Sequence, residues 1–159
     1  MEGENNNNEV EELNEKDGKI ISSTCIKKLL KAGETEGAKE LLYLPFSVTS
    51  EVIKGSQTGR TLGFPTANMK YPEHIVKLPF GVYKVNVLNR PAIANWGIKP
   101  TLNGKEPVLE VHIPDFSENL YGQLLKVEFI KKIRDERKFD SLDELKIQIT
   151  QDLKECLKL

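Results

Sequence analysis

Glycines, one basic residue and two short polar side chains come together in GSQTGRTLGFPTAN, residues 55–68. A loop of this kind can surround phosphate with backbone N–H groups and one cation, here through Gly55, Gly59, Arg60 and Gly63. It lacks the Gly-Lys-Ser/Thr ending of a Walker A loop, so it is not one. A plain connection between two strands has the same composition, and spacing alone favours that alternative.

Thr66 and Asn68 follow this loop and stand two residues apart. On an extended segment their side chains therefore face the same way. A hydroxyl and an amide oxygen are hard, neutral ligands, which suit a Mg²⁺ ion that nucleotide phosphates also hold. The alternative is that the two residues only close a turn, and the residues by themselves favour it.

Glu110 is a candidate general base in the segment PVLEVHI. Apolar and polar residues alternate there, so if Leu109, Val111 and Ile113 fill a core, Glu110 lies on the opposite face. A carboxylate on a rigid strand can accept a proton from a substrate hydroxyl. The alternative is a solvated strand residue, which is the default for a charged side chain.

Strands are the elements that must position these residues. Short β-rich segments separated by Gly, Pro or Asn occupy residues 46–55, 81–88, 92–98, 108–113 and 124–130. Helices do not alternate with them, so a parallel sheet is not expected. Five or six antiparallel strands of this length predict a mainly β fold, a small closed barrel.

Helices are expected at both ends of this barrel. Residues 20–45 are predicted to form a helical hairpin, with Gly33 ending its first helix and Thr35 capping its second. Near the C-terminus, Ser141 and Glu144 form a capping box. The helix that follows has an apolar stripe that we expect to pack on the barrel, made of Leu142, Leu145, Ile149, Leu153 and Cys156.

Length and charge limit the classes of function. A chain of 159 residues with a formal net charge of −1 has no global basic field for nucleic acid or a membrane surface, and its apolar stretches are too short to span a bilayer.

Residues 1–19 are acidic and Asn-rich, which predicts a disordered tail and no secretory signal. Cys25 and Cys156 lack metal-ligand spacing, so we expect thiols in a reducing cytoplasm. A monomer is the default expectation.

Five segments together resemble riboflavin kinase, most closely the kinase half of bacterial bifunctional riboflavin kinase/FAD synthetases: GRTLGFPTAN, LPFGVYKVNV, NWGIKPT, LEVHIPDFSENLYG and IRDERKFDSLDEL. The resemblance covers residues 46–159. It implies a six-stranded antiparallel Greek-key barrel with a C-terminal helix. It also implies ATP-dependent phosphorylation of riboflavin at the ribityl 5′-hydroxyl, giving FMN and ADP. The alternative is a non-catalytic flavin- or nucleotide-binding module, or a docking remnant of a bifunctional synthetase.

The resemblance also implies residue roles. The Thr and Asn of the family's Pro-Thr-Ala-Asn motif hold Mg²⁺ and nucleotide phosphates, and the Glu of its Glu-Val-His-Ile strand is the base, so these roles fall on Thr66, Asn68 and Glu110. Further ATP contacts are implied for Gly55, Gly59, Arg60, Gly63, Ile113, Asp115 and Tyr121. Flavin contacts are implied for Arg134, Arg137 and Phe139, although a solvated charged segment is the alternative there. ATP and flavin together are expected to order residues 55–63 and 131–140.

Residues 20–45 resemble the end of the adenylyltransferase domain that precedes the kinase in bifunctional enzymes. The pattern there ends Ser-Ser-Thr-Arg-Ile-Arg, whereas Cys25 and Lys27 stand at the two Arg positions here, and no His-x-Gly-His sequence occurs in the chain. We therefore expect no FMN adenylylation. The hairpin is expected to pack on the barrel or to serve as a docking piece.

Overall fold

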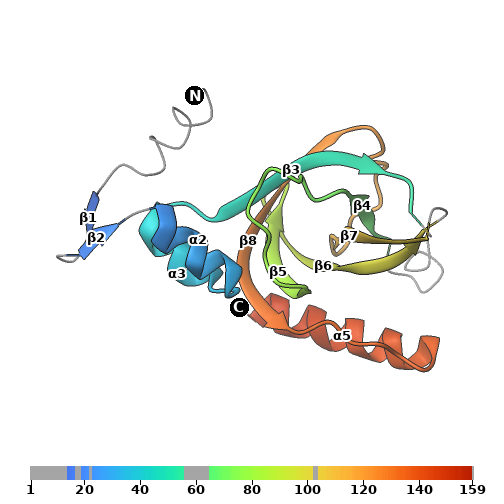
Figure 1. Ribbon diagram of the computed structural model, residues 1–159. Helices are drawn as coiled ribbons and strands as arrows, with labels where there is room; N and C mark the ends of the chain where they lie inside the picture. Colours follow the sequence, from blue (N-terminus) through green and yellow to red (C-terminus); the bar gives the residue numbers. More distant parts are fainter. Residues whose placement is uncertain (1–13, 17–18, 22, 56–64, 102–103, 159) are drawn as a thin grey trace.

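The main element of the protein is a closed barrel of six antiparallel strands, in the order β3-β4-β7-β6-β5-β8 (Figure 1). The computed structural model describes residues 14–16, 19–21, 23–55, 65–101 and 104–158. β5, β6 and β7 follow one another as hairpins, and β4 returns to lie beside β7, which is a Greek-key arrangement. The prediction of a six-stranded antiparallel Greek-key barrel is confirmed.

The barrel strands differ widely in length. Their bounds are Phe46–Ile53 (β3), Ala67–Met69 (β4), Gly81–Val87 (β5), Arg90–Thr101 (β6), Gly104–His112 (β7) and Leu124–Arg134 (β8). The short β4 includes Asn68, so the backbone at Asn68 is extended and does not form a turn. It pairs with β7 on one side and with β3 on the other, so it closes the barrel beside Glu110.

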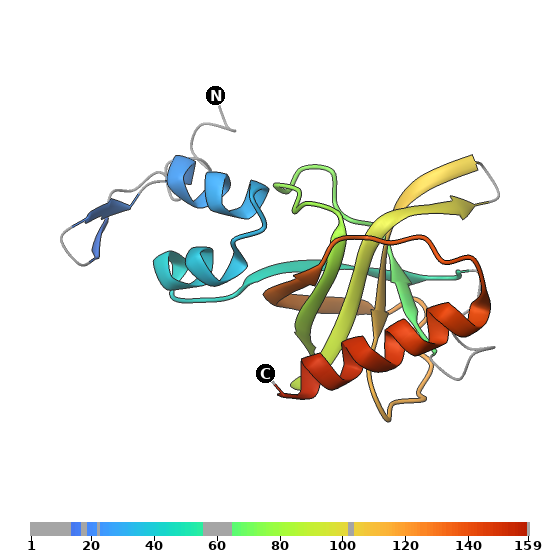
Figure 2. The same cartoon turned by 90° about the horizontal axis from the view of Figure 1, so that it is seen from below.

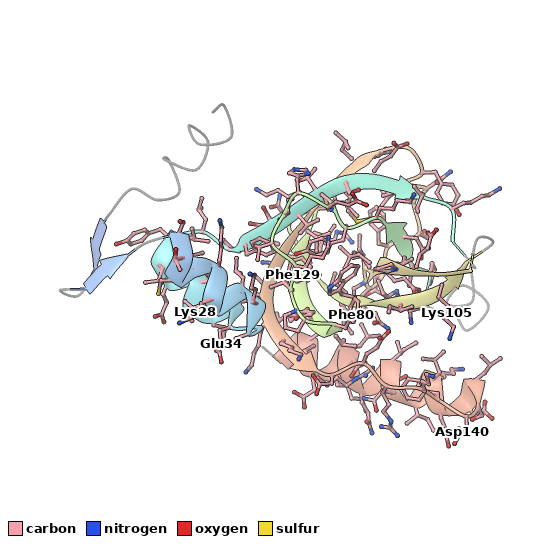
Figure 3. The ribbon with its side chains drawn as sticks, in the orientation of Figure 1. Lys28, Glu34, Phe80, Lys105, Phe129 and Asp140 are labelled. Carbon is pink, nitrogen blue, oxygen red and sulfur yellow. The ribbon has the colours of Figure 1, made fainter. Side chains whose placement is uncertain are left out.

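Alternate residues of each strand fill the barrel interior, because successive side chains of a strand point to opposite faces. Trp96, Leu109 and Phe129 are almost fully buried there, and Figure 3 shows Phe129 inside the ring of strands. Trp96 stacks on Tyr71 with ring centroids 4.6 Å apart, and its Nε1 donates to the Leu78 carbonyl oxygen at 2.9 Å. The indole is therefore satisfied within the core and belongs to the packing.

Helix α5, Leu142–Lys158, lies across the outside of the barrel (Figure 2). Ser141 Oγ accepts a hydrogen bond from the Glu144 N–H at 3.2 Å, and Glu144 Oε2 accepts one from the Asp140 N–H at 3.2 Å. The predicted N-terminal cap is confirmed, with the reciprocal bond made to Asp140. Leu142, in the first turn, is 56% exposed.

The apolar contact of α5 with the barrel is concentrated near the helix C-terminus, where Cys156 packs with Val82 and Ile93. The prediction that Leu142 packs on the barrel is therefore wrong. Cys156 Sγ donates to the Ala92 carbonyl oxygen at 3.2 Å, and burial raises the pKa of this thiol. The group is thereby kept in its neutral, weakly reactive form.

A helical hairpin, α2 (Ser23–Lys31) and α3 (Thr35–Leu42), packs beside β3 and β8 (Figure 1). Gly33 ends the first helix with a left-handed φ of 79°, which confirms that prediction. Thr35 is not a cap, because the capping position is Glu34 and makes no side-chain hydrogen bond. Thr35 Oγ1 instead donates to the Ile130 carbonyl oxygen at 3.2 Å and so attaches the hairpin to β8.

A small two-stranded sheet precedes the hairpin, formed by β1 (Asn14–Lys16) and β2 (Lys19–Ile21). Residues 14–16 and Lys19 of the predicted disordered tail thus lie in strands, while its residues 1–13 and 17–18 lie outside the described residues. Among the helices that the structure describes, none is long and apolar enough to cross a membrane.

Candidate functional site

Asn68, Glu110 and Asn95 lie side by side on the outer face of the barrel, and we call these three residues the outer-face row. The strand register pairs Asn68 with Glu110 and Glu110 with Asn95. Directly paired residues of antiparallel strands place their side chains on the same face. Leu109 and Val111 are buried in the interior, so Glu110 points outward, as the alternation predicted.

Thr66 precedes β4 and lies beside Asn68 on the wall of one cavity. His112, two residues after Glu110 on β7, fixes the approach to β4, because its Nδ1 lies 2.8 Å from the Pro65 carbonyl oxygen. A carbonyl oxygen only accepts, so Nδ1 carries the hydrogen. The sequence analysis missed this role of His112. The available signal was its spacing from Glu110, which puts both side chains on the outer face.

Gly55 lies directly against the side chain of Asn68. A Cβ atom added at Gly55 would overlap the Asn68 amide group, so a larger residue there would push the amide aside. The structure therefore brings together the first glycine of the predicted phosphate loop and one of the two predicted metal ligands. Gly59, Arg60 and Gly63, the other predicted residues of this loop, lie outside the described residues.

A cavity of about 450 Å³ opens beside the outer-face row. Four of the predicted ATP-binding residues line it, namely Thr66, Asn68, Ile113 and Tyr121. Asp115 lies in the same loop, between two lining residues, where the backbone turns with a φ of 56°. Small-molecule sites commonly have volumes of about 300–1,000 Å³, so the cavity is large enough for a nucleotide.

The donor chemistry beside this cavity suits a hard cation shared with phosphates. Thr66 supplies a hydroxyl and Asn68 an amide oxygen, and Asn68 is only 9% exposed. Mg²⁺ accepts a small number of such protein oxygens when phosphate oxygens and water complete its shell. Within the described part of the chain, no group of three or more His, Cys, Asp or Glu residues could hold a metal ion.

Lys99 on β6 connects Glu110 to the segment that follows β8. Its Nζ lies 3.6 Å from Glu110 Oε1 and 3.8 Å from Glu136 Oε1. The Glu136 carboxylate lies over Gly97, in space that a Cβ atom at this position would occupy. These side chains are 23–32% exposed, and pairs near the surface contribute at most about 1 kcal/mol each.

The three predicted flavin-binding residues come together beside α5. The guanidinium carbons of Arg134 and Arg137 lie 6.0 and 5.2 Å from the centre of the Phe139 ring. Arg134 donates to Asp152 from Nε at 3.0 Å and from Nη2 at 2.8 Å, and Asp152 is only 4% exposed. Arg137 Nη1 donates to Gln148 Oε1 at 3.0 Å. Both arginines are therefore engaged with the helix in this structure.

Asn95 is the member of the outer-face row that the sequence analysis did not single out. Its side-chain Oδ1 is buried, and no hydrogen-bond donor among the described residues reaches it. An unpaired buried acceptor costs about 1–3 kcal/mol, so this atom is an exception that needs an explanation. Strand alternation could have found it, because Ala94 and Trp96 on either side face the core.

Two comparisons of the sequence agree with this arrangement. A protein-family model for flavokinase, that is riboflavin kinase, matches residues 42–159. A bifunctional riboflavin kinase/FMN adenylyltransferase from Haemophilus influenzae is 44% identical over 142 residues, which are 86% of this chain and 46% of that protein. The chain spans about half the length of the curated relatives it matches.

Two solved structures have similar folds. A crystal structure of a macrolide-efflux protein from Streptococcus pneumoniae matches with a TM-score of 0.81 and 34% identity, over 91% of this chain and 49% of that chain. Riboflavin kinase from Trypanosoma brucei matches with a TM-score of 0.52 and 24% identity, over 72% of this chain and 79% of that chain. At this identity, the second likeness shows a shared fold.

Proposed function

This chain belongs to the riboflavin kinase family, and we propose that it transfers the γ-phosphate of ATP to the ribityl 5′-hydroxyl of riboflavin, giving FMN and ADP. The outer-face row supports this proposal most directly. It puts an acidic side chain, Glu110, next to Asn68, whose amide borders a nucleotide-sized cavity. In phosphoryl transfer, most of the rate comes from alignment of the reactants and from stabilisation of charge on the phosphates. An acidic residue beside a nucleotide-sized cavity can align the attacking hydroxyl with the phosphate.

Glu110 is the proposed general base. It must lie within hydrogen-bond reach of the 5′-hydroxyl and accept its proton as the new P–O bond forms. The carboxylate is on the outer face and 23% exposed, so a substrate can reach it. β4 and β6 flank it, which restricts where the hydroxyl can lie.

Thr66 and Asn68 are the proposed ligands of Mg²⁺, which when bound neutralises charge on the phosphates of ATP. Gly55 leaves the space that the Asn68 amide occupies, which a Cβ atom at residue 55 would fill. The adenosine part of ATP is assigned to the cavity, with contacts from Ile113, Asp115 and Tyr121. We also assign phosphate contacts to Gly55, Gly59, Arg60 and Gly63, on the resemblance of their loop.

The flavin ring is assigned to the side of the row that faces α5. The register continues from Glu110 through Asn95 and Val82 to Arg134, three strands away. With neighbouring strands about 4.8 Å apart, this span is roughly 14 Å. Because α5 covers Val82, a riboflavin that spans this distance must follow the edge of the helix. Arg137 and Phe139 are then the proposed ring contacts. Arg134, whose guanidinium lies 6.0 Å from the Phe139 ring, is proposed as a third flavin contact that also holds α5 through Asp152.

Glu136 must leave its place over Gly97 when the flavin binds, because its carboxylate lies on the surface beside Glu110 and Lys99. Movement of the segment 135–140 is therefore part of the proposed cycle. Closure of such a segment excludes water from the transferring phosphate and orients the substrate.

FMN adenylylation is not part of the proposed activity, because Cys25 and Lys27 replace the two arginines of the related pattern. Cys25 is exposed on α2 and is not a cation that could replace Arg toward a phosphate. A cytoplasmic, monomeric protein without nucleic-acid or membrane partners remains our expectation, and both cysteines are thiols in the structure.

Turnover of riboflavin with ATP and Mg²⁺, with the products separated by chromatography, tests the proposal. We expect equal amounts of FMN and ADP, and loss of both in a Thr66→Ala, Asn68→Ala double variant. The matched control changes Asn86 and Thr150 to Ala, away from the row. If the parent forms no FMN but quenches riboflavin fluorescence, the chain is a non-catalytic flavin-binding module. The appearance of FAD would show that our expectation about adenylylation is wrong.

A further inference from the structure

Asn95 has a position that no assigned role explains. It pairs with Glu110 on β7 in the strand register and with Val82 on β5. Its side chain therefore lies on the outer face, next to the Glu110 carboxylate and on the side that leads toward Arg134. A substrate that reaches from the flavin side to Glu110 must pass over Asn95.

The Oδ1 atom of Asn95 is a hydrogen-bond acceptor without a partner. It is buried, and none of the donors that the structure describes bonds to it. The nearby cations have other partners, since Lys99 pairs with Glu110 and Glu136 and Arg134 pairs with Asp152. Buried acceptors in folded proteins nearly always have a donor, which protein, ordered water or a ligand supplies. Asn95 Oδ1 lies beside the proposed base, so a hydroxyl of the substrate is a donor that the reaction itself brings to this place.

We propose that Asn95 Oδ1 accepts a hydrogen bond from a second hydroxyl of the polyol substrate, so that the neighbouring 5′-hydroxyl lies against Glu110. This inference rests on the proposed function and deepens it. Paired residues on neighbouring strands have Cα atoms about 4.5–5.5 Å apart, which suits two hydroxyl groups a few bonds apart on one chain. Asn95 is then a substrate-binding residue that selects an open polyol chain.

The amide type of this side chain fits the same role. A carboxylate at residue 95 would also accept a hydrogen bond, but it would put a second negative charge beside Glu110 and close to the incoming phosphates. An amide oxygen accepts the hydroxyl without that repulsion. Glu110 and Asn95 can thus each accept a hydrogen bond from one hydroxyl, and only Glu110 carries a negative charge.

The test compares riboflavin with analogues that each lack the 2′-, 3′- or 4′-hydroxyl, in the parent and in Asn95→Ala. We expect Asn95→Ala to lower kcat/KM for riboflavin about 10-fold. For the one analogue that lacks the bonded hydroxyl, parent and variant should have equal kcat/KM, because the interaction is already gone. Asn86→Ala, on β5 at the pairing positions of Pro91 and Glu128, is the matched control and should behave as the parent.

A second measurement separates this role from a structural one. Asn95→Leu fills a similar volume without an unpaired acceptor, so its midpoint of thermal unfolding should equal or exceed that of the parent while its activity falls. A lower midpoint together with equal losses on riboflavin and on all three analogues would mean that Asn95 only supports the fold, and would overturn the inference.

Failure of this inference differs from failure of the proposed function. If the parent makes FMN and Asn95→Ala makes it at the same rate with the same preference among analogues, Asn95 does not bind the substrate and the kinase proposal stands. If the parent makes no FMN from any substrate, the proposed function itself is wrong, and the inference falls with it.

Discussion

The two ends of the outer-face row differ in how their side chains are engaged. On the nucleotide side, Thr66 and Asn68 border an open cavity of about 450 Å³. On the flavin side, the guanidinium groups of Arg134 and Arg137 already bond to residues of α5. A cavity of about 470 Å³ also borders Arg134 and Asp152, so the two ends differ in the bonding of their side chains and not in the space beside them. We expect the flavin end to exchange internal contacts for ligand contacts.

This difference follows from the elements that support each end. The nucleotide side is set by strand register, because Asn68 and Glu110 are paired across β4 and β7. The flavin side is set by a segment of irregular backbone, residues 135–141, between β8 and α5. Register fixes which face of the barrel each side chain occupies, because a slip by one residue would turn every side chain of the strand over. An irregular segment can adopt another arrangement at modest cost. Substitutions at the two ends should therefore have different consequences.

Glu110→Gln should have the largest effect, on catalysis alone. Loss of a general base lowers kcat by about 10²–10⁴-fold, whereas loss of the partly exposed ion pair with Lys99 changes the free energy of unfolding by less than about 1 kcal/mol. Steady-state FMN formation and thermal unfolding measure the two quantities. The control is Glu106→Gln, on the same strand at the residue paired with Lys99 in the register. FMN formation by Glu110→Gln at the parent rate would reject Glu110 as the base.

Gly55→Ala should come next and should affect the nucleotide side only. The new methyl group displaces the Asn68 amide, so we expect kcat to fall about 10-fold or more and the Mg²⁺ concentration for half-maximal rate to rise. Gly37→Ala is the control, since its Cβ meets only ordinary contacts with Leu29 at 3.6 Å. An unchanged Mg²⁺ dependence in Gly55→Ala would argue against Asn68 as a metal ligand.

Asp152→Asn should affect stability as well as substrate binding, in contrast to the nucleotide side. It removes the charge that Arg134 contacts at 2.8 and 3.0 Å, so we expect the free energy of unfolding to fall by about 2 kcal/mol. The KM for riboflavin should rise while the KM for ATP stays the same. Asp143→Asn, exposed in the first turn of α5, is the control. Equal changes in both KM values would contradict a division into two ends.

Lys99→Met should have the smallest effect on the fold. The two ion pairs of Lys99 are partly exposed and longer than 3.5 Å, so their loss should change the free energy of unfolding by less than about 1 kcal/mol. Lys105→Met, at an exposed position near the β6–β7 turn (Figure 3), is the control. Chemical denaturation measures both. A loss of several kcal/mol in Lys99→Met alone would mean that the segment 135–140 is held more firmly than its contacts indicate.

The sequence predicted those parts of the molecule that local patterns determine. Alternation on β7 placed Glu110 on the outer face, and Gly33 and the Ser141 cap marked helix ends correctly. The pattern of residues within one strand does not show which residues of a distant strand will pair with it. The pairing of Asn95 with Glu110 therefore could not be derived, although Asn95 begins NWGIKPT, one of the five segments that resemble the family.

Two failures have the same physical origin. Thr35 is of a residue type that often caps helices, but its hydroxyl donates a hydrogen bond to a carbonyl oxygen of β8, 95 residues away in sequence. Leu142 continues the apolar stripe of α5, but the helix packs on the barrel mainly near Cys156. In both cases a tertiary contact decided what local propensity left open.

A crystal structure with ADP, Mg²⁺ and FMN bound tests the central claim most directly, which is that phosphate transfer takes place on the outer-face row. We predict the FMN phosphate between Asn68 and Glu110, the ribityl chain over Asn95, and Glu136 moved away from Gly97. FMN bound elsewhere, with Glu136 still over Gly97 and Glu110 out of reach of the phosphate, would contradict the account.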